Sequence, residues 1–278
     1  MGKRRRLERG RIRFMSIYEY TPILIYSIVI AFVFGTCMGS FLNCAAWRYV
    51  NGESVLKGRS HCTSCGHELG LRDLIPVISW LASKGRCRYC GERISARYPI
   101  TEVLFGIITV FCLLSFDFTV LCLRNYIFLA ALFVLTLTDI DAMVIPDGCH
   151  IASLAAWVAA EPFLFEGWKN LMYYAGAGLL FGGGLLAVSL ALDRAMGRDT
   201  LGGGDIKLVA VAGLYLGVIG TLFMLMIACL CGLIYNYLIN KTSEKGSAFP
   251  FGPWIASASA MMLLFGQPLV DLYMALLN

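Results

Sequence analysis

Charged residues are scarce in this chain, because Asp, Glu, Lys and Arg make up only 15% of its 278 residues. Soluble globular domains carry about 25% charged residues. The mean hydropathy of +0.71 points the same way, and several apolar runs reach the roughly 20 residues that cross a hydrocarbon core. These figures exclude an ordinary soluble domain and indicate an all-α protein that crosses a membrane several times.

Histidine is scarcer still, with three residues in the whole chain, His61, His67 and His150. The sequence has no G-x-S-x-G segment and no H-E-x-x-H segment, so neither a Ser-His-Asp hydrolase nor a helical zinc protease is indicated. A nucleic-acid-binding motif is absent as well, and no nucleic-acid partner is expected. Basic residues beside a membrane favour contact with anionic membrane lipid instead.

The apolar runs predict about eight transmembrane helices. We expect them near 21–46, 99–116, 120–138, 149–165, 171–192, 206–218, 221–240 and 254–276. The run 206–240 is too long for one span, and Gly217 and Gly220 are expected to mark a turn inside it. A removable signal peptide is not expected, because the first run continues from Pro22 to Trp47 without a small-residue cleavage site.

Span counting places the polar, cysteine-bearing segment, Asp139 and Asp205 on one side of the membrane. Outside the N-terminal tail, that side carries fourteen basic residues and the opposite loops carry two, so the positive-inside rule makes it cytoplasmic. The seven basic residues at 3–13 conflict with this rule, because a single first span places them on the opposite side. The expected parts are a basic tail (1–20), a first transmembrane helix (21–47), a four-cysteine cytoplasmic domain (48–97) and a membrane domain (98–278).

Four cysteines form two C-x₂-C pairs in the polar segment, Cys62 with Cys65 and Cys87 with Cys90. A glycine follows each pair and allows the tight turn that presents two thiolates to one ion. Four thiolates are typical of a closed structural zinc site, and disulfides are disfavoured in a cytoplasmic domain. The rival interpretation is a redox C-x₂-C pair, but that motif is expected once and near a βαβ pattern.

The same segment is rich in arginine, with Arg86, Arg88, Arg93 and Arg97 close to the second cysteine pair. These side chains either face anionic lipid or contact an acidic or carbonyl-rich part of a substrate. The two histidines beside the first cysteine pair would be surplus as ligands. We expect them to be solvated or to lie just outside the metal site.

Two acidic motifs stand at the ends of apolar runs. One extends from Asp139 through Asp141 to Asp147, and the other comprises Gly202, Gly203, Gly204, Asp205, Ile206 and Lys207. A carboxylate at a membrane edge is costly to place and marks a functional site by default. Asp205 could serve only as a helix N-cap, but three glycines before a cap are excessive. Glycines there would let another segment pass close to Asp205.

Two such carboxylates suit the chemistry of an aspartyl peptidase. One deprotonates a water molecule, while the other, protonated, polarises the scissile carbonyl group. Neighbouring carboxylates do not easily both ionise, so such a pair shares one proton. Depth in the membrane only mildly favours Asp139 over Asp141 as the first member of the pair.

Several motifs resemble those of the type IV prepilin peptidases, a GxGD family of membrane aspartyl proteases. The resemblance covers nearly everything from Gly39 to Pro253. The segments that carry it are 39–43, 61–67, 73–76, 85–91, 97–102, 139–147, 202–207 and 250–253.

The resemblance implies that Asp139 and Asp205 are the catalytic aspartates. The supporting residues are then Asp141, Asp147, Gly202, Gly203, Gly204 and Lys207. It also implies cleavage of the basic leader of type IV prepilins and pilin-like precursors at the cytoplasmic face of the inner membrane. N-methylation of the new amino terminus with S-adenosylmethionine is implied as a second activity. The methyl-donor site is not placed by the sequence, because no glycine-rich nucleotide loop is present.

Two other functions stay open at this point. Another intramembrane GxGD protease, similar to presenilin or the signal-peptide peptidases, would use the same aspartates but lacks a cysteine segment of this kind. A non-enzymatic transporter would use them to bind protons or cations. Incubation with a pilin-like precursor separates these functions, because only the peptidase yields a shortened product.

Overall fold

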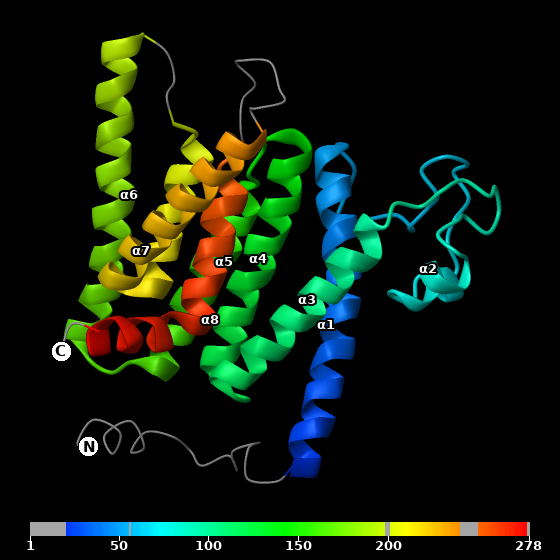
Figure 1. Cartoon of the computed structure of the whole chain (residues 1–278), viewed down its shortest axis with the longest axis horizontal. Helices are drawn as coiled ribbons and strands as arrows, with labels where there is room; N and C mark the ends of the chain where they lie inside the picture. Colours follow the sequence, from blue (N-terminus) through cyan, green and yellow to red (C-terminus); the bar gives the residue numbers. More distant parts are fainter. Residues whose placement is uncertain (1–20, 56, 198–200, 240–249, 277–278) are drawn as a thin grey trace.

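The computed structural model describes residues 21–55, 57–197, 201–239 and 250–276, so the basic tail at 1–20 lies outside the described residues. Within these ranges the chain is helical apart from its loops and two isolated β-bridges in the cysteine segment. The predicted all-α membrane fold is confirmed (Figure 1). The elements are α1 (Thr21–Val50), the 3₁₀ helix η2 (Leu71–Asp73), α2 (Ile78–Ala82), α3 (Arg97–Phe116), α4 (Val120–Ala142), α5 (Asp147–Leu164), α6 (Trp168–Met196), α7 (Gly203–Ile239) and α8 (Gly252–Leu276).

Most of the long helices are suited to a membrane. Among the described residues, five helices are long and apolar enough to cross one, namely α1, α3, α4, α6 and α7. The shorter apolar stretch Gly252–Gly266 belongs to α8. Each predicted span overlaps one of these helices or α5. The protein is therefore a multi-pass membrane protein.

The long helix α7 is broken at Gly217, where the backbone has φ 67° and ψ −176°. Only glycine adopts this conformation readily, because a Cβ atom is disfavoured at positive φ. A Cβ at this position would also collide with the ring of Tyr173. Figure 1 shows the chain reversing here, so that the yellow first half and the orange second half of α7 run in opposite directions. The structure thus has the break inside 206–240 at one of the two glycines that the sequence singles out.

The helix α4 lies at the centre of the bundle and packs against α1, α3, α5 and α8. Its buried side chains Phe128 and Leu135 belong to a core shared with α7 and α8, while Phe133 joins a second cluster with α1 and α3. In lipid, helices associate mainly through close packing and small residues. The approach of α6 to α7 illustrates this, since a Cβ on Gly213 would lie 2.7 Å from the Cα of Gly178.

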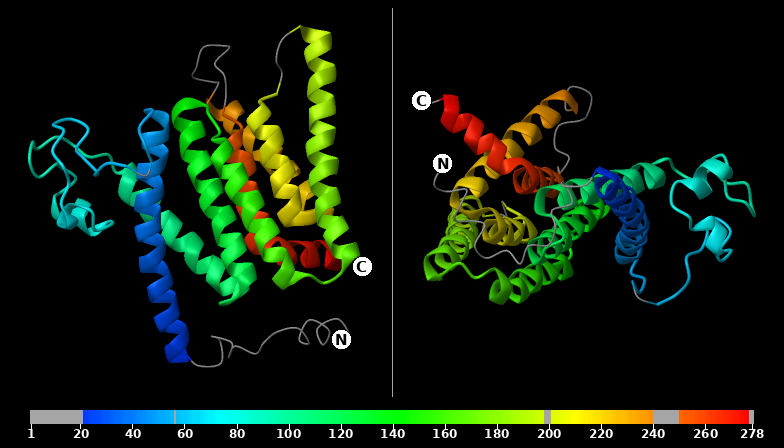
Figure 2. Two further views of the ribbon diagram at one scale, coloured as in Figure 1. Left: turned by 180° about the vertical axis from the view of Figure 1, so that it is seen from behind. Right: turned by 90° about the horizontal axis from the view of Figure 1, so that it is seen from below.

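Both acidic motifs lie at one end of the bundle. Figure 1 shows the C-terminal end of α4, the start of α7 and the C-terminal end of α1 at that same end. The cysteine segment between α1 and α3 lies beyond these two helices and away from α6 and α7, as both views in Figure 2 show. The placement of both acidic motifs at one end follows from the number of spans between them.

Candidate active site and metal centre

Asp139 lies in the last turn of α4. The helix ends at Ala142 and is capped by Met143, whose backbone has a φ of 54° and whose N–H donates to the Asp139 carbonyl oxygen at 2.9 Å. The Asp139 residue is only 5% exposed, and its Oδ2 atom is buried without a hydrogen-bond partner. An unsatisfied buried oxygen is costly, and in native proteins such a group is explained by a role in chemistry, by strain, or by a bound water or ion.

Asp205 lies in the first turn of α7, which begins at Gly203. The interpretation of Asp205 as an N-cap is wrong, because the helix starts two residues before it. A carboxylate in a first helical turn is favoured by the free N–H groups and the helix dipole. Nevertheless, the Oδ1 atom of Asp205 is also buried without a hydrogen-bond partner. Asp205 therefore shares with Asp139 the unusual state of a buried and unsatisfied carboxylate oxygen.

The turn between α4 and α5 brings the two aspartates together through Ile145. A Cβ added to Gly204 would lie 2.9 Å from the Cβ of Ile145, and one added to Gly252 would lie 3.2 Å from its Cδ1. The starts of α7 and α8 thus both pack against the Ile145 side chain. The Gly252 position also faces Asp139, since its added Cβ would lie 2.6 Å from Oδ2. Asp139 is near enough to interact electrostatically with Asp205.

The glycines before Asp205 act through their lack of a side chain. Positive φ values occur at none of Gly202, Gly203 and Gly204, so the turn does not need left-handed backbone. Gly204 permits the approach of Ile145, whereas a Cβ on Gly203 would meet nothing within 4 Å. A Cβ on Gly202 would lie 3.3 Å from Oδ2 of Asp205. Close approach is therefore required at Gly204.

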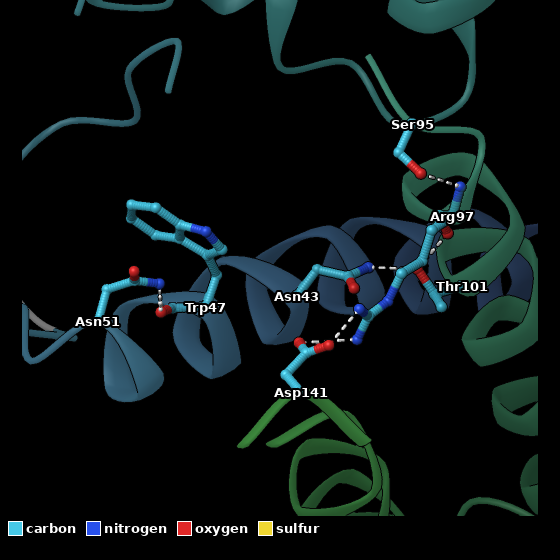
Figure 3. A network of polar contacts seen from close by, with 7 residues as sticks. All are labelled: Asn43, Trp47, Asn51, Ser95, Arg97, Thr101 and Asp141. Carbon is cyan, nitrogen blue, oxygen red and sulfur yellow. Dashed lines mark hydrogen bonds and ion pairs between the residues drawn. The ribbon is translucent and has the colours of Figure 1, made fainter. Parts of the chain in front are cut away.

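The other two candidate aspartates are held in ion pairs. Both oxygens of Asp141 accept hydrogen bonds from the Arg97 guanidinium, with Nη2 to Oδ2 at 2.9 Å (Figure 3). Asp147 Oδ1 lies 2.7 Å from Lys207 Nζ. The hydrogen bond from Lys207 holds the pKa of Asp147 below its usual range. Of the four candidates, the structure leaves Asp139 and Asp205 with free buried oxygens and places the other two against cations.

The Arg97 pair is part of a network that ties three helices together (Figure 3). Asn43 of α1 donates to Thr101 Oγ1 of α3 at 2.6 Å, and Thr101 in turn donates to the Arg97 carbonyl oxygen at 2.8 Å. Arg97 then reaches Asp141 at the end of α4. A second arginine, Arg88, pairs with Asp73 at 3.3 Å. Arg88 and Arg97 are thus each paired with a carboxylate of the chain, and contact of these partly exposed side chains with lipid or substrate stays a prediction.

The four cysteines of the polar segment form one cluster. The Sγ atoms of Cys62, Cys65, Cys87 and Cys90 all lie within 4.8 Å of one another. In a tetrahedral thiolate site with zinc–sulfur bonds of about 2.3 Å, the sulfurs stand about 3.8 Å apart, and the Cys62 and Cys90 sulfurs are 3.9 Å apart. Hydrogen bonds from the Cys65 and Ser64 backbone lower the pKa of Cys62 to about 6, whereas burial and hydrogen bonds to the other three thiols raise the pKa of Cys90 to about 12. The cluster therefore fits a metal ion.

The two cysteine pairs are built in the same way. The Gly66 N–H donates to the Cys62 carbonyl oxygen at 2.8 Å, and the Gly91 N–H donates to that of Cys87 at 2.9 Å. Both glycines have positive φ, at 70° and 78°. Repeated turns of this kind point two thiols inward from each loop. The predicted role of the glycines in these turns is confirmed.

The two neighbouring histidines contact aromatic rings. His61 meets Trp47 edge-on with ring centroids 6.0 Å apart, and His67 lies against Tyr89 with centroids 3.6 Å apart. Neither belongs to the cluster of candidate metal ligands found among the described residues. Their packing fits the expectation that they are not ligands.

Glu102 in α3 was not singled out from the sequence. It is only 7% exposed, and its Oε2 accepts a hydrogen bond from the Val77 N–H at 2.8 Å. Val77 has a φ of 61°, which is rare for a β-branched residue. The signal that could have found Glu102 is the one that found Asp139, a carboxylate near the end of an apolar run.

Comparison with protein families gives two matches along the chain. The Bacterial Peptidase A24 N-terminal domain matches residues 33–116, and the Type IV leader peptidase family matches residues 126–237. The first match includes the cysteine segment, and the second includes both Asp139 and Asp205.

Curated relatives share most of their length with this chain. The Prepilin leader peptidase/N-methyltransferase of Bacillus subtilis (strain 168) is 32% identical over 247 residues, which is 88% of this chain and 96% of that protein. The protein of the same name from Aeromonas salmonicida (strain A449) is 29% identical and spans 91% and 95% of the two chains. The Type 4 prepilin-like proteins leader peptide-processing enzyme of Escherichia coli O78:H11 is 31% identical, over 82% and 90%. No solved structure shows a significant match.

Proposed function

The chain belongs to the type IV leader peptidase family, and we propose from this premise that it is a membrane aspartyl endopeptidase with a second, methylating activity. Its substrates are type IV prepilins and pilin-like precursors, whose short basic leader it removes. The new amino terminus is then N-methylated. Support comes from the relatives, which carry both activities in their names.

Asp139 and Asp205 are the proposed catalytic pair. One observation carries this assignment: among the four candidate aspartates, these two have a buried carboxylate oxygen with no partner, while Asp141 and Asp147 are paired with cations. A free oxygen can take a proton from water or donate one to a substrate. A carboxylate fixed by arginine or lysine is poorly suited to either task.

In the proposed reaction, one member of the pair accepts a proton from a water molecule while the water oxygen attacks the scissile carbonyl carbon. The other member, protonated, donates a hydrogen bond to the carbonyl oxygen as negative charge develops there. The peptide C–N bond then breaks, and the leaving nitrogen takes up the proton. The atoms balance with one water consumed for each leader released.

The supporting residues hold this pair in place. Lys207 and Asp147 link the start of α7 to the start of α5, and Gly204 lets the two halves of the site meet at Ile145. Asp141 links the end of α4 to α3 through Arg97. These contacts fix the backbone on either side of each catalytic carboxyl group, which matters because a small misplacement of reacting groups slows catalysis strongly.

The proposed metal is zinc, held by Cys62, Cys65, Cys87 and Cys90. The distances between the sulfurs and the repeated turns support this assignment. With four protein ligands the ion would be closed to substrate, so its role is to fold the cysteine domain at 48–97. The peptidase part would comprise 98–278, following the first transmembrane helix at 21–47 and the tail at 1–20.

S-adenosylmethionine is the proposed methyl donor. When bound, it supplies a methyl group to the uncharged amine, so that a C–N bond forms as the C–S bond breaks and the sulfonium becomes a neutral thioether. Both this site and the catalytic pair would face the cytoplasm in the inner membrane. The excess of basic residues on the shared side of the chain and the charge of anionic lipid support this orientation.

The test uses purified full-length protein in lipid nanodiscs with a pilin-like precursor and S-adenosylmethionine. Mass spectrometry of the product is expected to show loss of the leader and gain of one methyl group. Omission of the donor should leave a shortened product without the methyl group. An intact precursor would contradict the proposal and would favour the transporter alternative.

A further inference from the structure

A large cavity lies between α1, the cysteine segment and the start of α3. Its volume is about 820 Å³. Small-molecule sites in proteins usually measure about 300–1,000 Å³ and combine aromatic walls with a few polar groups. The cavity is therefore large enough for a nucleoside-sized ligand with part of a peptide chain beside it.

The walls of the cavity offer aromatic surface from all three of its sides. Trp47 comes from α1, Trp80 and Tyr89 come from the cysteine segment, and Tyr98 comes from α3. Aromatic faces stack on purine rings and attract cations through their π electrons. A ligand that joins a purine to a positive charge would use both properties.

Glu102 supplies a negative charge to this cavity. It lines the wall and is only 7% exposed, and its one recorded hydrogen bond is to the Val77 N–H. No ion pair within the described part of the chain includes Glu102. A buried carboxylate without a cation is unfavourable unless something compensates its charge. A cationic ligand in the cavity would do so.

Four arginines line the cavity, and two of them, Arg48 and Arg88, are held by contacts within the chain. The Arg48 guanidinium donates to the carbonyl oxygens of Ser54, Val55, Lys57 and Gly58 at 3.2–3.5 Å, and so holds the loop that follows α1. Arg88 pairs with Asp73. These two cations stabilise the cavity walls. Within the described part of the chain none of the four lining arginines, Arg86 and Arg93 included, is ion-paired with Glu102, so a cationic ligand can still compensate its charge.

The backbone that meets Glu102 is strained. Val77 holds a φ of 61° and directs its N–H toward the carboxylate. A β-branched residue is unfavourable in this region, and such strain is concentrated at ligand and active sites. The strained turn fixes one carboxylate oxygen and so orients the group.

One ion pair links the wall of the cavity to the region of the peptidase site. Tyr98 and Pro99 line it, and the adjacent Arg97 forms the ion pair with Asp141, two residues beyond Asp139. Figure 3 shows Arg97 of α3 meeting Asp141 of α4 beside Asn43 of α1. An amino terminus released at Asp139 would therefore lie close to the α3 wall of the cavity.

We propose that this cavity binds the sulfonium methyl donor S-adenosylmethionine, with Glu102 compensating its positive charge and the aromatic walls receiving its adenine ring. The proposal rests on the methyl-transfer half of the proposed function. It assigns the donor to a site bounded by α1, the cysteine segment and α3.

Binding measurements with two ligands test the role of Glu102. Full-length protein in nanodiscs is titrated with S-adenosylmethionine, which is cationic at sulfur, and with S-adenosylhomocysteine, which is neutral there. In Glu102→Gln we expect affinity for the cationic ligand to fall by about tenfold or more, because a nearby charge interaction is lost. Affinity for the neutral ligand should change by less than about threefold. The matched control is Glu68→Gln, an exposed carboxylate paired with Arg59 outside the cavity, with both affinities unchanged.

Photo-crosslinking of labelled S-adenosylmethionine to the wild-type protein gives an independent readout. The label is expected on peptides from 37–48 or 60–102. Label confined to α5–α8, or equal affinity of wild type and Glu102→Gln for the cationic ligand, would overturn this site while leaving the proposed function intact. If Glu102→Gln loses affinity for both ligands, the site is judged by crosslinking of the wild-type protein. Label on 37–48 or 60–102 then supports the site, and label confined to α5–α8 overturns it. A wild-type protein that binds neither ligand would overturn both the site and the proposed methyl transfer.

Discussion

Arg97 and Asp141 form a two-point ion pair that joins the first turn of α3 to the last turn of α4. On one side, Asp141 is two residues from Asp139. On the other side, Arg97 is followed by Tyr98 in the wall of the cavity. One contact thus connects the region of the proposed peptidase pair to the region of the proposed methyl donor.

Replacing Arg97 tests this connection. Arg97→Lys keeps the positive charge but loses the planar two-point contact with Asp141. We expect kcat for leader cleavage to fall by about tenfold with KM nearly unchanged, because the turn that carries Asp139 is less well fixed. Steady-state kinetics on a pilin-like precursor measures both constants. The control is Arg59→Lys, which alters an exposed pair on the cysteine segment, and wild-type kcat in Arg97→Lys would refute the positioning role.

The approach of Gly204 to Ile145 makes a second prediction. In Gly204→Ala the new Cβ would lie 2.9 Å from the Cβ of Ile145, so the starts of α5 and α7 must move apart. Cleavage should slow by about 10- to 100-fold, since misplacement by about 1 Å has effects of this size. The second-site change Ile145→Ala should restore part of the rate. Gly203→Ala is the matched control. The resemblance places Gly203 among the supporting residues, but a Cβ there would meet nothing within 4 Å, so the rate of this variant should stay near wild type.

Metal content gives a third prediction. Elemental analysis of the purified protein should find one zinc per chain, and Cys65→Ser should lose it. Loss of the ion is expected to unfold the cysteine domain, because closed four-cysteine sites contribute directly to folding. Trp80 is a convenient reporter, since its Nε1 donates to the Ile94 carbonyl oxygen at 3.0 Å and its fluorescence should shift on chelation. A zinc-free protein with unchanged tryptophan fluorescence would contradict the structural role.

Much of the fold could be predicted because apolar runs of membrane length leave few choices for the backbone. Gly217 could be recognised because 206–240 is too long for one span, although the choice between Gly217 and Gly220 needs the backbone angles. The cysteine cluster could be predicted from spacing. Each C-x₂-C pair is followed by a glycine that allows a tight turn, and such a turn presents both of its thiols on one side, where they can share a metal ion with the other pair.

The choice among the aspartates shows the limit of sequence reasoning. Asp139 and Asp141 stand in one motif, and their positions in the sequence separate them only weakly. The structure separates them because Arg97, 44 residues away, reaches Asp141. In the same way, the contact of Glu102 with the strained Val77 depends on how the cysteine segment folds back on α3. Contacts between residues this far apart along the chain leave no local pattern in a single sequence.

The central claim is that Asp139 and Asp205 form the catalytic pair while Asp141 and Asp147 support it. The most direct measurement is leader cleavage by four matched variants, Asp139→Asn, Asp205→Asn, Asp141→Asn and Asp147→Asn, each checked for native folding by its thermal unfolding curve. The first two should lose cleavage by at least about 10³-fold, and the other two should lose about tenfold or less. Near wild-type cleavage by Asp139→Asn or Asp205→Asn, or complete loss only in Asp141→Asn or Asp147→Asn, would contradict the account.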